Sequence, residues 1–538
     1  MADSCTTKQT DDSEDLSLLP MSPNFGNYIT QSHGSKSPDG HLTRAAARIT
    51  YNMVENMPDS LMSLSRHLLY LSAWQDRCGP ALPPILEQFS SSESLQPMVS
   101  QAMAALSACR LSRLHPYKDY DSSRQFYFRP ALSHQIASQE AYCSAIQGVV
   151  SWRPLDGCPD ATIILRILLL FCCLESATGN FRGFELHSRG VAKLAESSIE
   201  SIFAIDKTRG IKLLQAWAEI KIHNWWLRFH FSTPQFLLSE VGFRLESTLR
   251  AFLSVAEPGR TSVLSILCES YWLSSVMHMH RWNKADLMGA AAPSRVTKLS
   301  LDSLLSDSIA RHEQALEDQK QMLSTWHSLV AGTDLPVDSF DDARPPVTHT
   351  CSGLNVKPLR FTSHAAAMNY AYYATARIVQ TDCGAESVQS SMLAESNNSG
   401  DESTLWSVLL LRVVAGIDWE ECLRLNPFTV GITGLLLVCS LRCSNPAISN
   451  WIQCWIEQRA IEESSEEGSF PVSQVLRSLR LINSERVSGL DVIGIFKPDE
   501  DGGGRGKHDS YQSQILTAVS VLCRDRDDSS YVLLKRNI

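Results

Sequence analysis

Apolar residues recur every three or four positions through most of the segment from residue 41 to residue 490. This spacing gathers them on one side of an α-helix, whereas a half-buried strand would need an apolar residue at every second position. In the stretch that begins at Leu95, for example, apolar residues fall at offsets 0, 3, 4, 7, 11 and 14. Alternating runs joined by hairpin turns are not seen in the sequence. The pattern therefore predicts an all-α fold, built as one large multi-helix body.

The periodicity also predicts where the helices lie. The helix at 161–177 is apolar nearly all round, so we expect it to be deeply buried. Asp160 is its expected N-cap, and Gly179 suits its C-terminal stop. The other expected helices lie at 60–78, 95–109, 131–150, 181–197, 209–231, 261–282, 297–331, 361–380, 402–423, 428–443, 446–463 and 471–484.

Composition divides the chain into three parts. Residues 1–40 are rich in Ser, Asp, Thr and Pro and carry two Lys against six Asp or Glu, a net charge of −4. Such a segment buries too little apolar surface to offset its ordering entropy, so we expect a disordered acidic tail. Residues 41–490 are expected to form the helical body, and residues 491–538 a Gly-rich loop followed by a C-terminal helix or tail. The surface loops expected to interrupt the helical texture lie at 333–358, 382–401 and 488–509.

Charge and hydropathy limit the partners. The chain has 48 Lys and Arg against 58 Asp and Glu, a net charge of −10, and no run of four basic residues. Since phosphate neutralisation supplies most nucleic-acid affinity, we expect little direct nucleic-acid binding. The longest apolar stretches, 163–174 and 430–441, fall short of the roughly 18 residues that span a bilayer. Residues 1–20 lack the hydrophobic run of a signal peptide, so we expect a soluble intracellular protein with reduced cysteines and no membrane partner.

The fifteen cysteines do not predict a metal site. The motif CxxC occurs nowhere, so zinc-ribbon, finger and binuclear-cluster spacings are absent. His312 and Glu313 begin an HExxH motif, but Leu316 stands where the second histidine must be. His278 and His280 are two residues apart, which places them on different sides of a helix, where they cannot share a metal ion.

Two further motifs match ligand-binding signatures only in part. Asp11, Asp12 and Asp15 have the DDxxD spacing of magnesium–diphosphate sites, but they lie in the polar tail, where a solvated acidic tract is expected. The segment 502–507 is Gly-rich, but Asp501 stands where a P-loop needs glycine, and a flexible loop is expected. The sequence predicts no catalytic residue, no metal ligand and no cofactor.

A stripe of small residues marks the segment that follows the buried helix. Gly183, His187, Gly190 and Leu194 fall at offsets 0, 4, 7 and 11, on one face of a helix. Each interior glycine costs that helix about 1 kcal/mol relative to alanine. We therefore expect another backbone to pass close to this face. His187 has no Ser, Cys or Asp partner pattern, so a hydrogen-bonded interior histidine is favoured over a catalytic one.

The stretch from Leu168 to Leu194 resembles the core of the fungal-specific transcription factor domain, the helical middle region of fungal zinc-binuclear-cluster regulators. It carries a buried helix that ends in Leu-Glu at Glu175, then the turn Gly179-Asn180, and then the pattern Gly-x3-His-x2-Gly-x3-Leu. Other segments resemble that family in the same order along residues 50–490: an early alanine-rich helix at 102–111, a leucine-x-x-tryptophan helix with Leu323, Trp326 and Leu329, a tyrosine-bearing helix at 364–379, and late Gly- and Trp-bearing helices at 428–455. The resemblance implies that Glu175, Gly179, Asn180, Gly183, His187, Gly190, Leu194 and Trp326 are structural motif residues of a regulatory domain.

One departure from the family matters as much as the match. Family members carry six cysteines as two CxxCx6C motifs near the N-terminus, which hold two zinc ions and place a short helix in the major groove. This chain has only Cys5 before Cys78, and no basic segment follows it. The resemblance therefore implies a regulatory body without its own DNA-reading module. Whether a preceding exon encodes that module stays open.

The function that the resemblance implies is a transcriptional regulator or co-regulator that controls a secondary-metabolite biosynthetic gene cluster. It would be located in the nucleus, or otherwise in the cytoplasm, and act through a DNA-binding transcription factor or the transcription machinery. A homo- or heterodimer and a small-molecule effector fit the same family. The acidic tract 11–19 could recruit transcription machinery, although a terminus with no role is favoured. The alternatives are a helical enzyme with an unrecognised site and a helical scaffold outside transcription.

Overall fold

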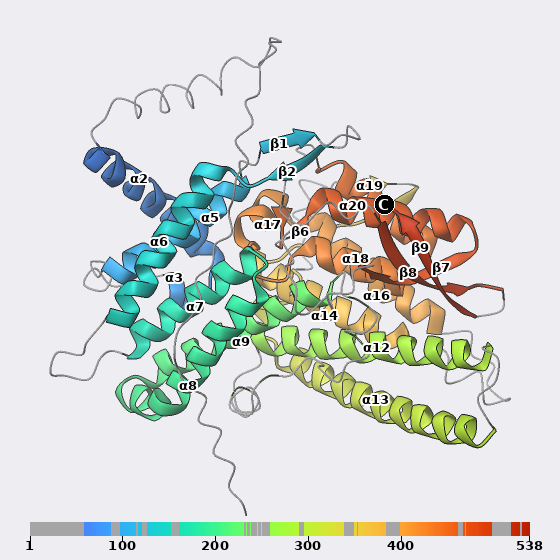
Figure 1. Cartoon of the computed structure of the whole chain (residues 1–538). Helices are drawn as coiled ribbons and strands as arrows, with labels where there is room; N and C mark the ends of the chain where they lie inside the picture. The colour runs from blue at the N-terminus through green and yellow to red at the C-terminus, as the bar shows by residue number, and fades with distance from the viewer. Residues whose placement is uncertain are drawn as a thin grey trace, which may run out of the picture. The chain divides into compact units, whose positions relative to one another are not determined.

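The computed structural model describes residues 59–87, 97–114, 117–120, 126–151, 161–230, 259–289, 295–337, 349–351, 353–382, 399–460, 466–468, 470–497, 518–527 and 530–538, and four single residues between 231 and 258 (Figure 1). The chain divides into two compact units, residues 1–63 and residues 64–538, and every interaction given below lies within the second. The expected disordered tail, its boundary at residue 40 and the expected cap Asp160 lie outside the described residues.

Helices dominate the described residues, so the predicted all-α class is confirmed. The long helices are α2 (Asp59–Ala73), α5 (Pro97–Leu114), α6 (Leu132–Ser151), α7 (Ala161–Ala177), α8 (Phe181–Ile205), α9 (Lys207–Phe229), α12 (Arg260–Gly289), α13 (Arg295–Leu329), α14 (His364–Asp382), α16 (Ser399–Gly416), α18 (Ile432–Arg442), α19 (Pro446–Glu457) and α20 (Val472–Val487). Short turns of helix complete the set: η1 (Trp74–Cys78), η2 (Gly79–Ala81), α3 (Pro84–Glu87), η3 (Gly332–Asp334) and α17 (Trp419–Leu425).

The helix bounds follow the sequence pattern closely where caps are clear. The helix α7 has the expected bounds and is buried around most of its circumference. One expected helix, 402–423, is instead two, because Asp418 starts α17 by accepting a hydrogen bond from the Glu420 N–H. A strong internal cap thus divides a segment that hydrophobic periodicity alone treats as continuous.

The C-terminal part is an antiparallel sheet, so the expected C-terminal helix or tail is wrong. Strands β7 (Leu490–Phe496), β8 (Ala518–Asp525) and β9 (Tyr531–Asn537) pair in that order. A bulge between Val492 and Gly494 interrupts the alternation of β7, and the connection to β8 is long. Because of both features, the pairing of β7 with β8 does not appear in the sequence as two alternating runs joined by a tight turn.

Short antiparallel hairpins occupy other positions outside the helices. They are β1 (Tyr117–Tyr120) with β2 (Phe126–Arg129), β3 (His349–Cys351) with β4 (Leu354–Val356), and β5 (Glu466–Glu467) with β6 (Phe470–Pro471). The hairpin β3–β4 lies in the gap 333–358 and strand β7 in the gap 488–509, both of which were expected to be loops. The strands β1 to β6 have two to four residues each, which is too short to give a readable alternation.

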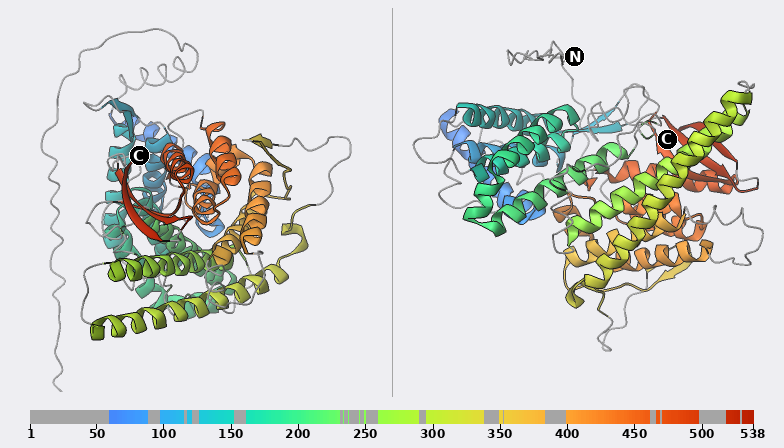
Figure 2. Two further views of the ribbon diagram at one scale, coloured as in Figure 1. Left: turned by 90° about the vertical axis from the view of Figure 1, so that its right-hand side faces the viewer. Right: turned by 90° about the horizontal axis from the view of Figure 1, so that it is seen from below.

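A large apolar core connects most of the described helices, and two smaller clusters adjoin it in sequence. It contains residues from Trp74 to Cys523, and Trp226, Trp451 and Trp455 are completely buried in it. Helix α7 packs against α5, α8 and α9 within this core, while α12 and α13 lie side by side as a long antiparallel pair (Figure 2). In the described part of the chain, none of the helices combines the length and hydropathy required to cross a bilayer.

Candidate functional site

The junction between α7 and α8 places the motif residues. Gly179 has φ of 69°, a left-handed conformation that glycine adopts without steric cost. The Gly179 N–H donates to the Ser176 carbonyl and the Asn180 N–H to the Glu175 carbonyl, which is a Schellman ending. Asn180 then begins α8, because its side chain accepts a hydrogen bond from the Gly183 N–H at 3.2 Å. The expected stop at Gly179 is confirmed, and one turn serves as the end of one helix and the start of the next.

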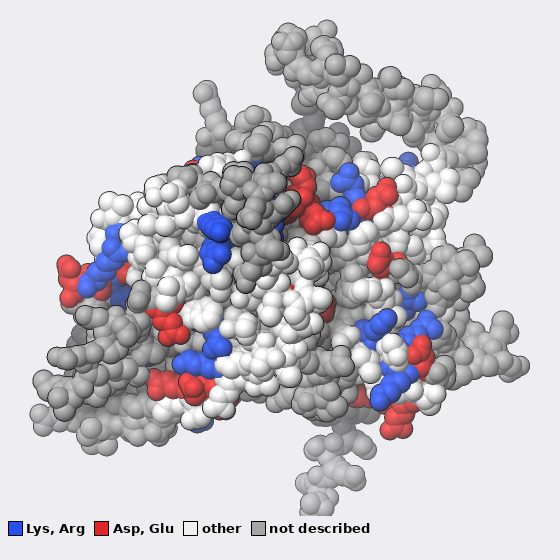
Figure 3. All heavy atoms as spheres, turned by 180° about the vertical axis from the view of Figure 1, so that it is seen from behind, with Lys and Arg blue, Asp and Glu red and all other residues white. Residues whose placement is uncertain are grey.

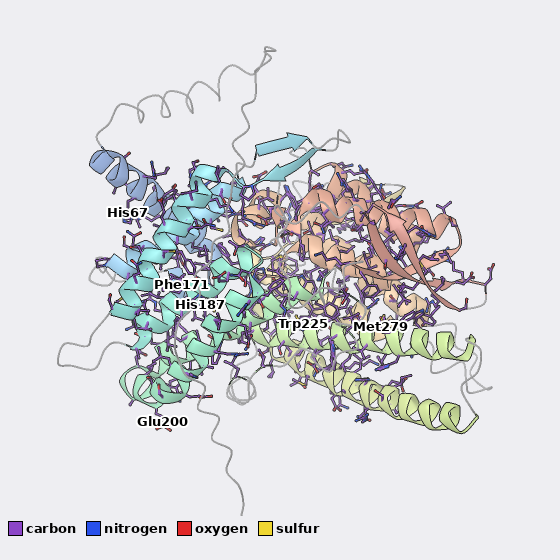
Figure 4. All side chains as sticks on the ribbon, in the orientation of Figure 1. His67, Phe171, His187, Glu200, Trp225 and Met279 are labelled. Carbon is purple, nitrogen blue, oxygen red and sulfur yellow. The ribbon has the colours of Figure 1, made fainter. Side chains whose placement is uncertain are left out.

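Three polar side chains from three helices meet beside this junction. The Tyr142 hydroxyl of α6 donates to Oε1 of Glu175 on α7 at 2.5 Å. The same hydroxyl lies 2.5 Å from Nε2 of His187 on α8, and that nitrogen is 3.8 Å from Oε1 of Glu175. The rings of Phe171 and His187, both labelled in Figure 4, lie with their centroids 5.1 Å apart. We call Tyr142, Glu175 and His187 the α7–α8 polar group.

Burial suppresses charge on this group. It raises the pKa of Glu175 and of Tyr142, and it lowers the pKa of His187 to about 4. In each case the first cause is loss of hydration, which penalises the charged form. His187 is neutral near pH 7, which leaves two arrangements of hydrogen bonds. In the first, the Tyr142 hydroxyl donates to an ionised Glu175, and Nε2 of His187 carries a hydrogen. In the second, a protonated Glu175 donates to Tyr142, and Tyr142 donates to Nε2 of His187. The second arrangement contains one proton more than the first, so the group can take up or release a proton, as acid–base sites do.

The two glycines of the expected stripe behave differently. A Cβ added at Gly183 would lie 2.5 Å from Cδ of Glu175, so this glycine is required by a close approach. A Cβ added at Gly190 would lie 3.6 Å from a methyl group of Leu168, an ordinary contact. The expectation that another backbone passes close to this face is therefore wrong: at Gly183 the neighbour is a side chain, and at Gly190 there is room.

The stripe itself lies on the border of the buried face. The buried positions of α8 alongside the expected stripe are Phe184, Ser188, Val191 and Ala195, each one residue out of phase with it, and Phe181 and Ile202 are buried as well. His187, Gly190 and Leu194 are partly buried. His187 is confirmed as a hydrogen-bonded interior histidine. Its partner Tyr142 was missed, because a tyrosine 45 residues away gives no local pattern.

A cavity of about 230 Å³ adjoins the α7–α8 polar group. Tyr142, Glu175 and Asn180 line it, together with the amides of Gln135 and Gln139 on α6. The lining offers both donors and acceptors of hydrogen bonds, and Glu175 supplies a group whose charge depends on its surroundings. The site is thus suited to a small polar ligand.

A buried cluster of charges closes one wall of the cavity. Arg113, which lines the cavity, donates from Nε to Glu466 at 3.1 Å and from a terminal nitrogen at 2.5 Å. Arg110, one turn earlier on α5, donates to the same carboxylate at 3.3 Å and to the Leu423 carbonyl at 3.2 Å. The side chains of both arginines and of Glu466 are almost completely buried. The two guanidinium groups share one carboxylate from the β5–β6 hairpin.

The next residue of that hairpin, Glu467, caps another helix. Its carboxylate accepts from the backbone N–H groups of Ile432 and Thr433 at the start of α18, and from the side chains of Thr433 and Asn426. Gly431 leaves room for this carboxylate, because a Cβ there would overlap it. An acidic group at a helix N-terminus is stabilised by the unpaired N–H groups there. Sequence reasoning missed both glutamates, because their partners are distant in the chain.

Trp326 belongs to a different group of contacts. Its indole N–H donates to the Gly259 carbonyl at 3.0 Å, and its ring stacks on Tyr373 of α14. Leu323 is buried on the same face of α13, whereas Leu329 is 60% exposed. The motif residues named by the resemblance therefore fall in two places, with Glu175, Asn180, Gly183 and His187 together and Trp326 on the α13–α14 pair.

The histidine motifs are explained by packing. Leu316, at the position where HExxH needs its second histidine, is a core residue with Leu273 and Met277. His278 lies 3.4 Å from the Tyr531 hydroxyl of β9, while His280 stacks on His312 of α13. Within the described ranges, His, Cys, Asp and Glu side chains form no cluster of three or more suited to a metal ion. The DDxxD tract and the Gly-rich segment 502–507 lie outside the described residues.

Acidic and basic side chains are intermixed on the face drawn in Figure 3. Among the described residues of that face, blue groups lie next to red ones rather than merging into one broad basic area. On the described part of this face, the distribution forms no broad positive area, in agreement with the net charge of −10.

Comparisons with known proteins add no relative: no protein-family model matches the chain, and neither a curated protein nor a solved structure is significantly similar to it.

Proposed function

We propose that this chain is a transcriptional regulator or co-regulator that controls a secondary-metabolite biosynthetic gene cluster through other proteins. The observation that supports the proposal is the meeting of Glu175, Asn180, Gly183 and His187 at one junction beside a cavity. The resemblance to the fungal regulatory domain singles out these residues as a motif. The helical body then serves as an effector-sensing or dimerising module, which acts in the nucleus.

The effector in this proposal is a small polar molecule that enters the cavity. Its lining carries amides, a phenol and a carboxyl group that can gain or lose a proton. A ligand that donates a hydrogen bond to Glu175 would favour the carboxylate form and draw the Tyr142 proton toward it. The α7–α8 junction would respond, because Glu175 also lies against Gly183 at the start of α8.

DNA contact in this proposal comes from a partner. With its acidic balance, the chain alone should bind duplex DNA with a Kd of about 10⁻⁴ M or weaker at physiological salt. A DNA-binding transcription factor that docks on the helical body would carry it to promoters. Chromatin occupancy should then disappear when that partner is deleted, while the chain stays soluble and folded.

The test combines chromatin immunoprecipitation, transcript profiling after deletion, and a salt-titrated binding assay with purified protein. Nuclear location, promoter occupancy that depends on a partner, and altered transcripts of one gene cluster are the expected results. Tight, sequence-selective binding by the purified chain would contradict the partner-dependent account. Absence of occupancy at every promoter would favour a scaffold or an enzyme.

One observation favours the enzyme alternative. The α7–α8 polar group joins a carboxyl, a phenol and an imidazole next to a cavity, which is an arrangement suited to proton transfer. Turnover of a small polar substrate that is lost in Tyr142→Phe and in Glu175→Gln, with folding retained, would support this alternative over regulation.

A further inference from the structure

Two cysteines distant in the sequence lie side by side between the β3–β4 hairpin and α19. Cys351 ends β3 and Cys454 is in the last turn of α19. The Gln458 side-chain N–H₂ group lies 3.4 Å from the sulfur of each. The Cys454 thiol is also within hydrogen-bonding reach of Cys351.

The surroundings make the two thiols unequal. Cys351 is 3% exposed, whereas Cys454 is partly exposed. The pKa of Cys351 is raised to about 11, mainly by burial and further by the neighbouring Cys454. Gln458 and Arg459 lower it to a smaller extent. Because a thiolate is the form that attacks an oxidant, Cys351 is a poor first nucleophile. The more accessible Cys454 is therefore the one that an oxidant meets first.

We propose that Cys351 and Cys454 form a peroxide-sensitive thiol pair that oxidises to a disulfide and fastens the β3–β4 hairpin to α19. In the first step the Cys454 thiolate attacks hydrogen peroxide, the O–O bond breaks, and Cys454 sulfenic acid and hydroxide form. In the second, the Cys351 sulfur attacks the Cys454 sulfur, a disulfide forms, and the Cys351 proton leaves with the sulfenic hydroxyl as water. Each disulfide thus consumes one peroxide, and a thiol reductant reverses it.

The bond would add a covalent link between the β3–β4 hairpin and α19. The hairpin leads into Leu359, whose N–H donates to the Arg412 carbonyl of α16, and α19 carries the buried Trp451 and Trp455. A covalent link across 103 residues restricts the unfolded chain strongly, so oxidation should raise the thermal stability. This inference does not depend on the proposed function.

Other cysteines of the described part provide controls. Cys143 is exposed on α6 and offers an oxidant an accessible thiol outside the pair. Cys172 and Cys173 are adjacent within α7 and buried, so helix geometry holds their side chains apart. Cys143→Ser is the matched control because it removes an accessible thiol and leaves the pair intact.

The experiment treats the reduced full chain with hydrogen peroxide, blocks remaining thiols by alkylation, and maps cross-linked peptides by mass spectrometry. Trypsin leaves Cys443 and Cys454 in one peptide, so fragmentation spectra must assign the sulfur. We expect the Cys351–Cys454 disulfide as the main product in wild type and in Cys143→Ser. It should be absent in Cys454→Ser and reversed by dithiothreitol.

The result that overturns the proposal is oxidation of Cys454 to sulfinic acid in the folded wild-type chain without a Cys351 cross-link. Cross-links spread evenly over several cysteine pairs would overturn it as well, because they would report unfolding. Since the wild-type chain itself gives both readouts, the test does not rely on the folding of any variant. A second readout is the melting temperature, which should rise on oxidation of wild type and Cys143→Ser but not of Cys454→Ser.

Discussion

The hydroxyl of Tyr142 lies 2.5 Å from Oε1 of Glu175, although the two residues are on different helices and 33 positions apart. This contact brings α6 to the junction of α7 and α8 and gives the buried carboxyl a hydrogen-bond donor. Since His187 lies at the same distance from the hydroxyl, one phenol satisfies two buried groups.

Replacing Tyr142 with phenylalanine should destabilise the fold by about 1–3 kcal/mol, because two buried polar groups lose their partner. Chemical denaturation followed by circular dichroism measures the change. Tyr373→Phe is the matched control, since its ring contacts with Trp326 and His327 are kept. Equal losses for the two variants would show that the hydroxyl of Tyr142 has no special role.

The two glycines of α8 should respond to alanine with opposite signs. Gly183→Ala places a Cβ 2.5 Å from Cδ of Glu175 and should lower stability by about 1–3 kcal/mol. Gly190→Ala meets only an ordinary contact and should raise stability by about 0.5–1 kcal/mol, because alanine favours the helix. Thermal unfolding of the two variants and of wild type measures these changes. A Gly183→Ala variant more stable than wild type would contradict the close approach described for Glu175.

Removing the charge of Glu467 should destabilise α18. In Glu467→Gln, an N–H₂ group replaces one of the two carboxylate oxygens, and that group then faces other N–H and O–H donors. The free energy of unfolding should fall by about 2 kcal/mol. Glu185→Gln, in an exposed pair with Arg189, is the control and should change stability by less than about 0.5 kcal/mol. The free energies of unfolding in urea give the comparison; a similar small effect for both would rule out the capping role.

Stability should fall as the pH drops from about 6.5 toward 4. Burial lowers the pKa of His187 and of His230 to about 4, and that of His223 to about 3, so the unfolded chain binds protons that the folded chain excludes. For His187 alone the loss is about 3 kcal/mol. Glu175 acts in the opposite sense, because burial raises its pKa and its ionisation costs stability as the pH rises.

Melting temperatures at several pH values between 7.5 and 4.5 measure this dependence. The dependence of stability on pH should be weaker in His187→Gln, because glutamine does not titrate. The difference in bound protons between the unfolded and folded chains should fall by about one. An unchanged slope in that variant would mean that the pKa of His187 is the same in the folded and the unfolded chain, which would contradict the effect of burial.

The sequence predicted the helices better than the contacts between them. The limits of α7 were correct because its apolar residues and the glycine at position 179 are local signals. The strands β7 to β9 were missed, since the bulge at Val492 and Gly494 breaks the alternation. Pairing across the sheet depends on contacts that a local pattern does not carry.

The candidate site was predicted only in part, for the same reason. Glu175, Asn180 and Gly183 lie within a few residues of one turn, so their pattern was visible. Tyr142 and Glu466 come from elsewhere in the chain and are placed by packing. Local periodicity identifies which face of a helix is buried, but not which polar side chain another helix brings to it.

The β5–β6 hairpin has a practical consequence for mapping functional regions by deletion. Glu466 and Glu467 reach in different directions, to Arg110 and Arg113 on α5 and to the first turn of α18. A chain truncated before residue 466 would lose both carboxylates at once. Loss of activity in such a truncation would then report damage to α5, more than 350 residues away, and to α18, rather than removal of a functional segment. Substitutions of single residues are therefore the more informative way to divide this chain into functions.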